Sequence, residues 1–428
     1  MKKVLIPLVY DYYLFDYFTN LIKELKKRKY VVYVFTADKS IYYKYKNIGA
    51  EVRFLPLLIR LFLKRSGKIF FRSFLWISSY FWVVKIRRNY DFCIVPWDNK
   101  PLWNVILRNI PSLTVHSTTN LISIESELSE HRAIKSYRLQ EFFERKTNLK
   151  ILPRFNNVVL KHNKFWYLDK IFGMKSQNLI QGFSGVNHVT VTGKKIKSTL
   201  LDAGLDESKT KLHVVGNPSY DGFIEFAKNF DKTQYLNIKK KFNIPLNSNL
   251  YSLFLSPSCF SDTQIKEVSL VIDTIYRFDN SAAIFLKLHP KTNISFIRIF
   301  ESLLLKKKLP FYITKKFYGD LFNLKIILSS KCILQKQGTV GYISMLVSKP
   351  IISYDFFKTN YHDDMFKILK SSFHCESPEE MITALNKLEN KTGKKELDKL
   401  QDLACQNFCI RDNNCSKKIV DIIDNHLK

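Results

Sequence analysis

The stretch AAIFLKLHPKT, residues 282–292, indicates the fold class of this chain. Its first seven residues are apolar except for Lys287, and His289 and Pro290 follow directly. A short, continuous apolar run is typical of a strand that is buried on both faces of a parallel sheet. Proline lacks a backbone donor and stops such a strand. We therefore expect His289 at the carboxyl end of a strand, where open parallel sheets bind their ligands. From the spacing alone, a purely structural histidine is an equally good interpretation.

Buried strands and helices alternate through the first half of the chain. The intervening segments 13–28 and 42–49 show apolar residues at helical spacing and a closing glycine, respectively. The expected strands lie at 3–9, 30–37, 51–57, 90–96, 112–118, 188–193 and 211–217. Apolar strands that are separated by helices predict a parallel sheet covered on both faces.

The second half repeats this pattern. Its expected strands lie at 249–257, 282–290, 309–314, 325–330, 332–335 and 349–355, and its expected helices at 261–278, 294–307, 338–346 and 378–428. The sequence therefore predicts an α/β protein of two Rossmann-like, doubly wound parallel-sheet domains, residues 1–220 and 221–400.

The chain is strongly basic, with 68 Lys and Arg against 38 Asp and Glu and a net charge of +30. This charge predicts attraction to anions such as nucleotide phosphates, acidic glycans or lipid headgroups, although AT-rich coding would also produce a Lys-rich chain. We expect no specific nucleic-acid partner, because the sequence has no recognition helix, RNA-binding sheet motif or zinc finger. Seven cysteines without paired spacing predict a reduced chain without a metal site.

Residues 57–88 mix aromatic and basic side chains. This mixture suits an anionic membrane surface; the alternative is a buried helix with basic flanks. No apolar run reaches the roughly 20 residues of a membrane span, and the apolar run at residues 1–10 is too short for a secretory signal. We expect a cytoplasmic protein that lies peripherally on the inner face of the cell membrane.

Polar residues follow several expected strands of the second half. Ser256 and Ser258 follow the first of these strands, Ser329 and Ser330 close the run 325–330, and Gly338 and Thr339 open a helix. Amides and hydroxyls at the start of a helix bind phosphate groups. Each piece alone is common turn chemistry, but several on one sheet edge beside a histidine predict an anion-binding site.

Several segments resemble GT-B glycosyltransferases, and the first is HVTVTGKKIKSTLLDAGLDESKTKLHVVGNPSYDGF (188–223). VPWDNKP (95–101), KLHPK (287–291) and GTVGYISMLVSKPIISYD (338–355) resemble elements of capsular polysaccharide transferases, CMP-sugar transferases, CDP-glycerol glycerophosphotransferases and UDP-N-acetylglucosamine 2-epimerases. CIRDNNCSKKIVDIIDNHL resembles the last helix of that fold. The resemblance implies a GT-B fold with a deep interdomain cleft, and a C-terminal helix within 401–428 that crosses back to the N-terminal domain.

The resemblance also implies a function. We expect a metal-independent glycosyltransferase without a cofactor, whose donor substrate is a nucleotide-sugar, with a CMP-linked acidic sugar ranked first. The acceptor would be a surface glycan, such as capsule or lipopolysaccharide, or a lipid-linked molecule. The alternatives are a CDP-polyol phosphotransferase and a UDP-sugar epimerase or hydrolase on the same fold. The acidic residue with which the family binds the donor ribose is replaced here by Ile343, which argues mildly against the epimerase.

The resemblance implies that the N-terminal domain binds the acceptor and the C-terminal domain binds the donor. The implied donor-binding residues are Ser256, Ser258, Lys287, His289, Pro290, Ser329, Ser330, Gly338, Thr339 and Asn217. His289 would hold the leaving phosphate, whose growing charge it stabilises. Asp98 or His116 would be the general base, because each ends an expected strand of the first domain; a turn residue and a partly buried histidine are the alternatives. Glu125 and Glu127 are weaker candidates on a solvated helix face.

Overall fold

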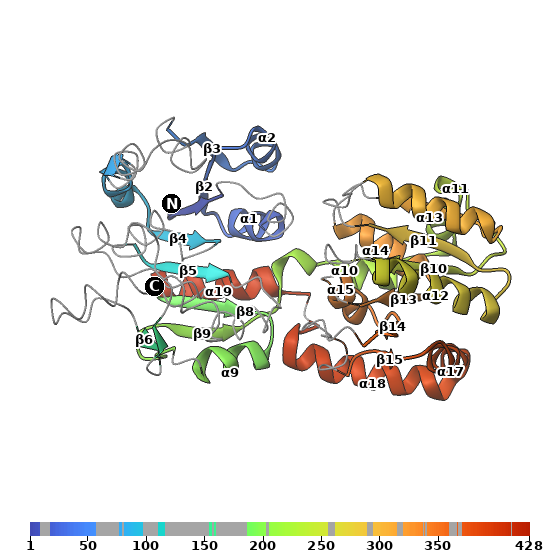
Figure 1. Ribbon diagram of the computed structural model, residues 1–428. Helices are drawn as coiled ribbons and strands as arrows, with labels where there is room; N and C mark the ends of the chain where they lie inside the picture. Colours follow the sequence, from blue (N-terminus) through green and yellow to red (C-terminus); the bar gives the residue numbers. More distant parts are fainter. Residues whose placement is uncertain are drawn as a thin grey trace, which may run out of the picture. The chain divides into compact units, whose positions relative to one another are not determined.

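The computed structural model shows two compact units (Figure 1). Unit 1 consists of Met1–Asp221 and Asn414–Lys428, and unit 2 of Gly222–Asn413. The structure describes residues 1–8, 18–56, 77–78, 81–96, 110–115, 154–155, 158–159, 186–202, 205–255, 262–288, 294–314, 320–336, 338, 340–358, 366, 370–411 and 413–428. Unit 2 is therefore an insertion between two segments of unit 1.

Unit 1 is built on a seven-stranded sheet of order β3-β2-β1-β4-β5-β8-β9, in which every pairing is parallel. Its strands are β1 (Lys3–Pro7), β2 (Val31–Thr36), β3 (Glu51–Phe54), β4 (Phe92–Val95), β5 (Ser112–Val115), β8 (His188–Val191) and β9 (Lys211–Val214). The small antiparallel pair β6 (Arg154–Phe155) and β7 (Val158–Val159) stands apart. All seven strands predicted for the first half are confirmed.

The described helices of unit 1 include two that face its main core, α1 and α19. The helices are α1 (Thr19–Lys27), α2 (Lys39–Asn47), α9 (Lys194–Asp202) and α19 (Cys415–Leu427), with short 3₁₀ turns η2 (Arg87–Asn89) and η3 (Pro218–Tyr220). Ile419, Val420 and Ile423 of α19 are fully buried in the same cluster as the strand residues of β1, β2, β4 and β5. Figure 1 shows α19, coloured red, beside the cyan strand β5 and the green strand β8. Helix α19 thus completes the hydrophobic core that the strands and helices of Met1–Asp221 form.

The carboxylate of Asp221 caps helix α19. The backbone N–H groups of Cys415 and Ser416 donate to its two oxygens at 2.9 and 2.8 Å. A carboxylate at a helix N-terminus satisfies orphan amides and opposes the positive end of the helix dipole. Asp221 is the last residue of the first segment of unit 1, so this bond ties together the points where the chain leaves the unit and returns to it.

Unit 2 is built on a six-stranded parallel sheet of order β12-β11-β10-β13-β14-β15. Its strands are β10 (Leu250–Phe254), β11 (Ala283–Lys287), β12 (Phe311–Thr314), β13 (Cys332–Gln335), β14 (Ile351–Tyr354) and β15 (Phe373–Cys375). Its helices are α10 (Phe223–Lys228), α11 (Lys232–Lys241), α12 (Asp262–Phe278), α13 (Ile294–Lys306), α14 (Asp320–Ser329), α15 (Val340–Leu346), α17 (Pro378–Glu389) and α18 (Lys391–Phe408).

Helices cover both faces of this second sheet. Leu253 and Leu286 share one buried cluster with Val271 of α12 and Leu385 of α17. On the other face, the ring of Phe285 lies 5.4 Å from that of Phe242, which follows α11. The central strands are buried on both sides, as their continuous apolar sequences predict. The doubly wound α/β class expected from the sequence is confirmed in both units.

One expected strand is wrong, and the strands β6, β7 and β15 were not predicted. Residues 325–329 belong to helix α14 rather than to a strand, and Ser330 lies in the bend that follows. Leu324, Ile326 and Ile327 are all fully buried, so the helix is apolar around its circumference and lacks the amphipathic period that distinguishes helix from strand. The additional edge strand β15 is three residues long and has no apolar run. Residues 401–408, expected in the crossing segment, are the end of α18 in unit 2.

No helix among the described residues combines the length and the apolar character that crossing a bilayer requires.

Three imidazoles form a chain between the sheet of unit 1 and helix α19. His188 Nδ1 lies 3.0 Å from His213 Nε2, and His188 Nε2 lies 2.8 Å from His426 Nδ1. Burial, together with the neighbouring His213, His426 and Lys211, lowers the pKa of His188 to about 4. His188 is thus neutral in the folded protein at pH values where the unfolded chain binds a proton.

This pKa shift predicts a pH-dependent stability. Because the pKa of His188 is about 4 in the folded state against 6.5 in the unfolded state, its contribution is complete above pH 6.5 and is lost as the pH falls towards 4. We expect the urea midpoint to decline over this range, and less steeply in His188→Leu. Thr190→Val, in the same strand, is the control that changes packing without a titrating group. Equal pH slopes in wild type and His188→Leu would contradict the assignment.

Candidate functional site

The strands of unit 2 end at one level on the carboxyl edge of the sheet. Phe254, the last residue of β10, pairs in register with Lys287 of β11 on one side and with Gln335 of β13 on the other. Lys287 in turn pairs with Thr314, the last residue of β12. The four neighbouring strands β12, β11, β10 and β13 therefore end at the same level of the sheet. Leu255, Leu288 and Lys336 follow these strand ends directly, and open α/β sheets bind their ligands at this edge.

Many of the predicted site residues lie outside the described residues. These are Asp98, His116, Ser256, Ser258, His289, Pro290 and Thr339, together with Glu125 and Glu127. The sequence places Ser256 two residues after β10 and His289 two residues after β11. Their expected roles remain predictions.

Lys287 and Gly338 both belong to the carboxyl edge. Lys287 is 8% exposed and lies on the same face of β11 as Phe285, because side chains alternate along a strand. Gly338 has φ +134°, and a Cβ atom there would lie 2.4 Å from Nε2 of Gln335. The glycine therefore lets the buried amide of Gln335 pack against the loop that follows β13.

Ser329 and Ser330 lie at the opposite edge from the one expected. Ser329 ends helix α14, Ser330 follows it, and both precede β13, so they belong to the amino edge of the sheet. The Ser330 hydroxyl donates to the carbonyl of Ile326 at 2.7 Å and lies 2.6 Å from Oγ of Ser252. Ser330 is 2% exposed, and its bonds join helix to strand. Placing the pair at a carboxyl strand end was wrong, because residues 325–329 are helical.

Asn217 has a structural contact in unit 1. It precedes η3 and accepts from the backbone N–H of Ser219 at 3.0 Å and from its hydroxyl at 2.7 Å. It is 5% exposed. Its side chain thus shapes the turn of the GNPSYD segment, which ends at Asp221.

The structure reveals a buried charge network at the carboxyl edge that the sequence analysis missed. Nζ of Lys336, the residue directly after β13, donates to Oε2 of Glu267 at 3.1 Å and also to Asp355, which follows β14. The side chains of Lys336 and Glu267 are 9% and 2% exposed. Burial raises the pKa of Glu267, and the Lys336 ammonium opposes that shift. One ammonium between two carboxylates fixes three segments of unit 2 to one another.

A signal for this network was present in the sequence. Lys336 follows the buried strand CILQ without an intervening residue, and Glu267 lies within the apolar stripe of helix α12. A charge at either place is costly unless it is paired. Which acid pairs with which base depends on the strand order, which the sequence does not state.

Helix α15 starts beneath the same edge. Ile343, which stands where the resembling family has an acidic residue, is 1% exposed and lies in the core. A Cβ atom on Gly341 would approach Cζ of Phe366 to 2.1 Å, so the glycine admits this ring against the first turn of the helix. The family's usual position for a ribose-binding carboxylate is thus occupied by apolar packing.

No protein-family model matches this chain, and no curated protein matches it in sequence. Its fold, in contrast, is shared with solved structures. A glycosyltransferase from Rickettsia africae ESF-5 has a TM-score of 0.59 at 12% identity, over 100% of this chain and 99% of the other. The UDP-GlcNAc 2-epimerase from Neisseria meningitidis, solved with UDP-GlcNAc, has a TM-score of 0.59 at 12% identity, over 99% and 100%.

A third similar structure is the wall teichoic acid polymerase TagF, soaked with CDPG. It has a TM-score of 0.55 at 12% identity, over 100% of this chain and 88% of the other. At these identities the likeness concerns the fold. The two parallel sheets with their flanking helices, in a chain that matches such proteins over its whole length, give this protein the two-domain α/β fold of the GT-B type.

The network at the carboxyl edge predicts an asymmetric response to mutation. Lys336→Met leaves the Glu267 and Asp355 carboxylates without their shared cation, so we expect the free energy of unfolding to fall by about 3–5 kcal/mol. The double variant Lys336→Met/Glu267→Gln should recover part of that loss, because one buried charge is removed. Both values come from urea unfolding followed by circular dichroism.

Lys331→Met is the matched control for this experiment. Lys331 pairs with Glu389 at 2.5 Å, but the side chains are 26% and 49% exposed. Exposed pairs contribute about 0–1 kcal/mol. A loss for Lys336→Met no larger than that for Lys331→Met would contradict the assignment.

Proposed function

We propose that this protein is a glycosyltransferase that moves a sugar from a nucleotide-sugar donor to a glycan or lipid-linked acceptor. The observation that carries this proposal is the level carboxyl edge of unit 2, where β10, β11 and β13 end in register at Phe254, Lys287 and Gln335. His289 and the loop with Gly338 follow directly from two of these strand ends. Solved proteins that share the fold include a glycosyltransferase and an enzyme with UDP-GlcNAc bound, which supports a nucleotide-linked substrate.

The proposed reaction is a displacement at the anomeric carbon of the donor. An acceptor oxygen forms a bond to this carbon, while the bond from the carbon to the nucleotide phosphate oxygen breaks and its electrons leave with the phosphate. A base removes the acceptor proton, and Asp98 and His116 are the candidates from unit 1. His289 and the amides around Gly338 stabilise the departing phosphate, whose negative charge grows in the transition state.

Lys336 has no such role in this proposal. Its ammonium is held by Glu267 and Asp355, so its charge is already matched within the protein. Phosphate binding would instead come from residues that follow the strand ends: His289, Ser256, Ser258 and Thr339. The donor that we rank first is a CMP-linked acidic sugar, on the likeness of KLHPK to CMP-sugar transferases.

Two alternative reactions use the same edge of the sheet. A CDP-polyol phosphotransferase would break a phosphate bond rather than a glycosidic one, and the fold shared with TagF favours it. A UDP-sugar epimerase is favoured by the fold shared with the Neisseria enzyme. The buried Ile343 argues against the epimerase, because α15 then offers no carboxylate for ribose.

We further propose that the protein works in the cytoplasm, on the inner face of the membrane, in the synthesis of a surface polysaccharide. Residues 81–86 are helical, and Phe81 is 59% exposed. Lys85 and Arg88 are also exposed and lie on the same side of this segment, at spacings of four and seven residues. An exposed aromatic ring beside basic side chains suits anionic headgroups.

The nucleotide preference tests the proposed function. We expect CMP or CDP at millimolar concentration to raise the melting temperature of the purified protein more than UMP, UDP, GDP or ADP. His289→Ala should abolish this rise, because the phosphate would lose its main contact. A rise selective for uridine nucleotides would shift the assignment to UDP-sugars. No rise with any nucleotide would overturn the donor site.

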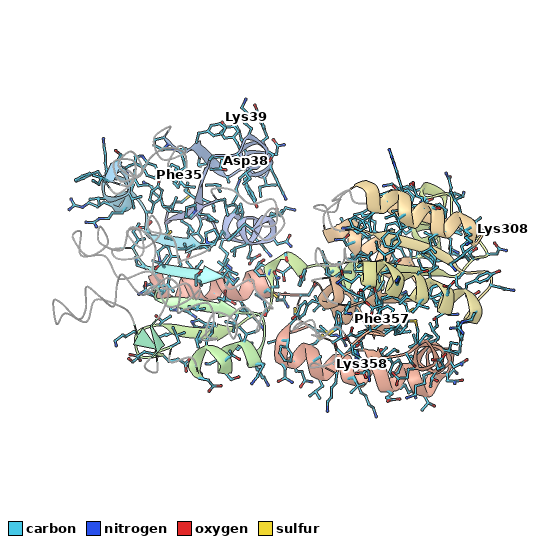
Figure 2. The ribbon with its side chains drawn as sticks, in the orientation of Figure 1. Phe35, Asp38, Lys39, Lys308, Phe357 and Lys358 are labelled. Atoms are coloured by element: carbon cyan, nitrogen blue, oxygen red, sulfur yellow. The ribbon has the colours of Figure 1, made fainter. Side chains whose placement is uncertain are left out.

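Vesicle flotation tests the membrane proposal. We expect the protein to float with vesicles that contain phosphatidylglycerol and not with neutral phosphatidylcholine vesicles, because the attraction is electrostatic. Phe81→Ser/Lys85→Glu should reduce flotation several-fold. The control Leu305→Ser/Lys308→Glu changes an equally exposed apolar and basic pair in unit 2 (Figure 2). If both double variants lost flotation equally, the cause would be the change in net charge, and the proposal that residues 81–88 form a specific membrane-binding surface would be wrong.

A further inference from the structure

The turn after β14 presents an aromatic ring at the carboxyl edge of unit 2. Asp355–Lys358 form this turn, in which the N–H of Lys358 donates to the carbonyl of Asp355 at 3.1 Å. The N–H of Asp355 donates to the carbonyl of Cys375 at 2.9 Å, so the start of the turn is anchored to strand β15. Phe357, in the middle of the turn, is 41% exposed (Figure 2).

The side chain of Glu267, on helix α12, holds this turn in place. Its buried carboxylate accepts from the N–H of Phe357 and from the ammonium of Lys336. The same ammonium donates to Asp355 at the first position of the turn. The loop after β13 and the turn after β14 are thus joined through three charged side chains. The backbone that carries Phe357 is held at both ends and in the middle.

Phe357 is exposed, whereas both of its neighbours in sequence make side-chain contacts with the rest of unit 2. Phe356, the preceding residue, packs against the main core of unit 2. Lys358 extends away and pairs with Glu376 at 3.4 Å, with its side chain 72% exposed. A single exposed apolar residue on a helix needs no explanation. Phe357 is a different case, because a buried ion network holds its backbone at the edge where open parallel sheets bind their ligands.

The other exposed aromatic residue described in unit 2 lies at the opposite edge. Tyr276 is 42% exposed and lies in the last turn of α12, which runs from the carboxyl edge back towards the amino edge. The two rings are thus equally exposed in the same unit, and their positions on the sheet differ. Tyr276 serves as an internal control for Phe357.

We propose that Phe357 is a binding residue that stacks its ring on a ring of the nucleotide-sugar, either the base or the sugar. This inference rests on the proposed function and adds a contact to the same site. Stacking on an aromatic face suits both partners, because the base is a flat π-system and a pyranose offers an apolar face. Glu267 is the positioning residue, since it acts through the turn that it holds. The contact supplies affinity where Ile343 offers no carboxylate.

The test uses the full-length protein and the nucleotide with the largest thermal shift in the panel described above. Its dissociation constant is measured by titration calorimetry with wild type, Phe357→Ala, Phe357→Trp and Tyr276→Ala. Losing one stacking contact weakens binding roughly tenfold or more. We expect this loss in Phe357→Ala, wild-type affinity in Phe357→Trp, and no change in Tyr276→Ala. Because Phe357 is exposed, its removal should leave the melting temperature of the free protein unchanged.

Glu267→Met tests the positioning role. It removes the acceptor of the Phe357 N–H, so we expect weaker nucleotide binding. The double variant Glu267→Met/Phe357→Ala should bind no more weakly than the weaker single variant, because both changes act on one contact. A purely structural role of Glu267 would give additive losses.

Two further arms identify the ring. UDP and UDP-N-acetylglucosamine, or CMP and a CMP-sugar, are compared in Phe357→Ala according to the nucleotide selected. A loss for both ligands assigns the base, and a loss for the sugar-bearing ligand alone assigns the sugar. Equal affinity of wild type and Phe357→Ala for both ligands overturns this inference and leaves the proposed function standing. A wild-type protein that binds no nucleotide overturns the proposed function and the inference together.

Discussion

Parallel pairing of the strands is the constraint on which the rest of this molecule depends. Every strand pair in the two main sheets is parallel, so each connection must cross from one edge of the sheet to the other, and helices cover both faces. The same rule brings the carboxyl ends of distant segments together. Residues 254, 287, 314 and 335 are widely spaced in sequence and stand in one row. A binding edge is thus a consequence of the topology, and the residues after each strand decide its chemistry.

The sequence predicted the fold well, because the strands of a parallel sheet that is buried on both faces are continuous apolar runs separated by helices. Most strands of the main sheet of unit 1 are buried apolar runs, and all seven of that sheet were predicted. The failure at KIILSS has a physical cause: apolar residues lie all around α14, so its sequence lacks the period that distinguishes a helix from a strand. That error moved Ser329 and Ser330 to the wrong edge. The association of Glu267 with Lys336 depends on strand order, which periodicity does not contain, and several predicted site residues lie outside the described part of the chain.

At the carboxyl edge of unit 2, the buried positive charge of Lys336 has a structural role. Lys336 is enclosed and matched by Glu267 and Asp355, so its charge serves the cohesion of the loops. Gly338, two residues later, makes room for the buried amide of Gln335. In the function proposed here, phosphate binding falls to other groups that follow the strand ends, while Lys336 stays paired within the protein. In a strongly basic chain, the lysines that are fixed in buried ion pairs need not be the ones that bind anions.

The capping of α19 by Asp221 has a consequence for the order in which the protein is made. Residues 222–413 emerge from the ribosome before residues 414–428, and unit 2 draws all its strands from that earlier stretch. Domains fold as units once their residues are available. The larger segment of unit 1 is synthesised before unit 2, but its core is complete only when Ile419, Val420 and Ile423 have been added. Unit 1 therefore finishes folding after unit 2, and until then its uncovered apolar face is a surface that a chaperone could bind.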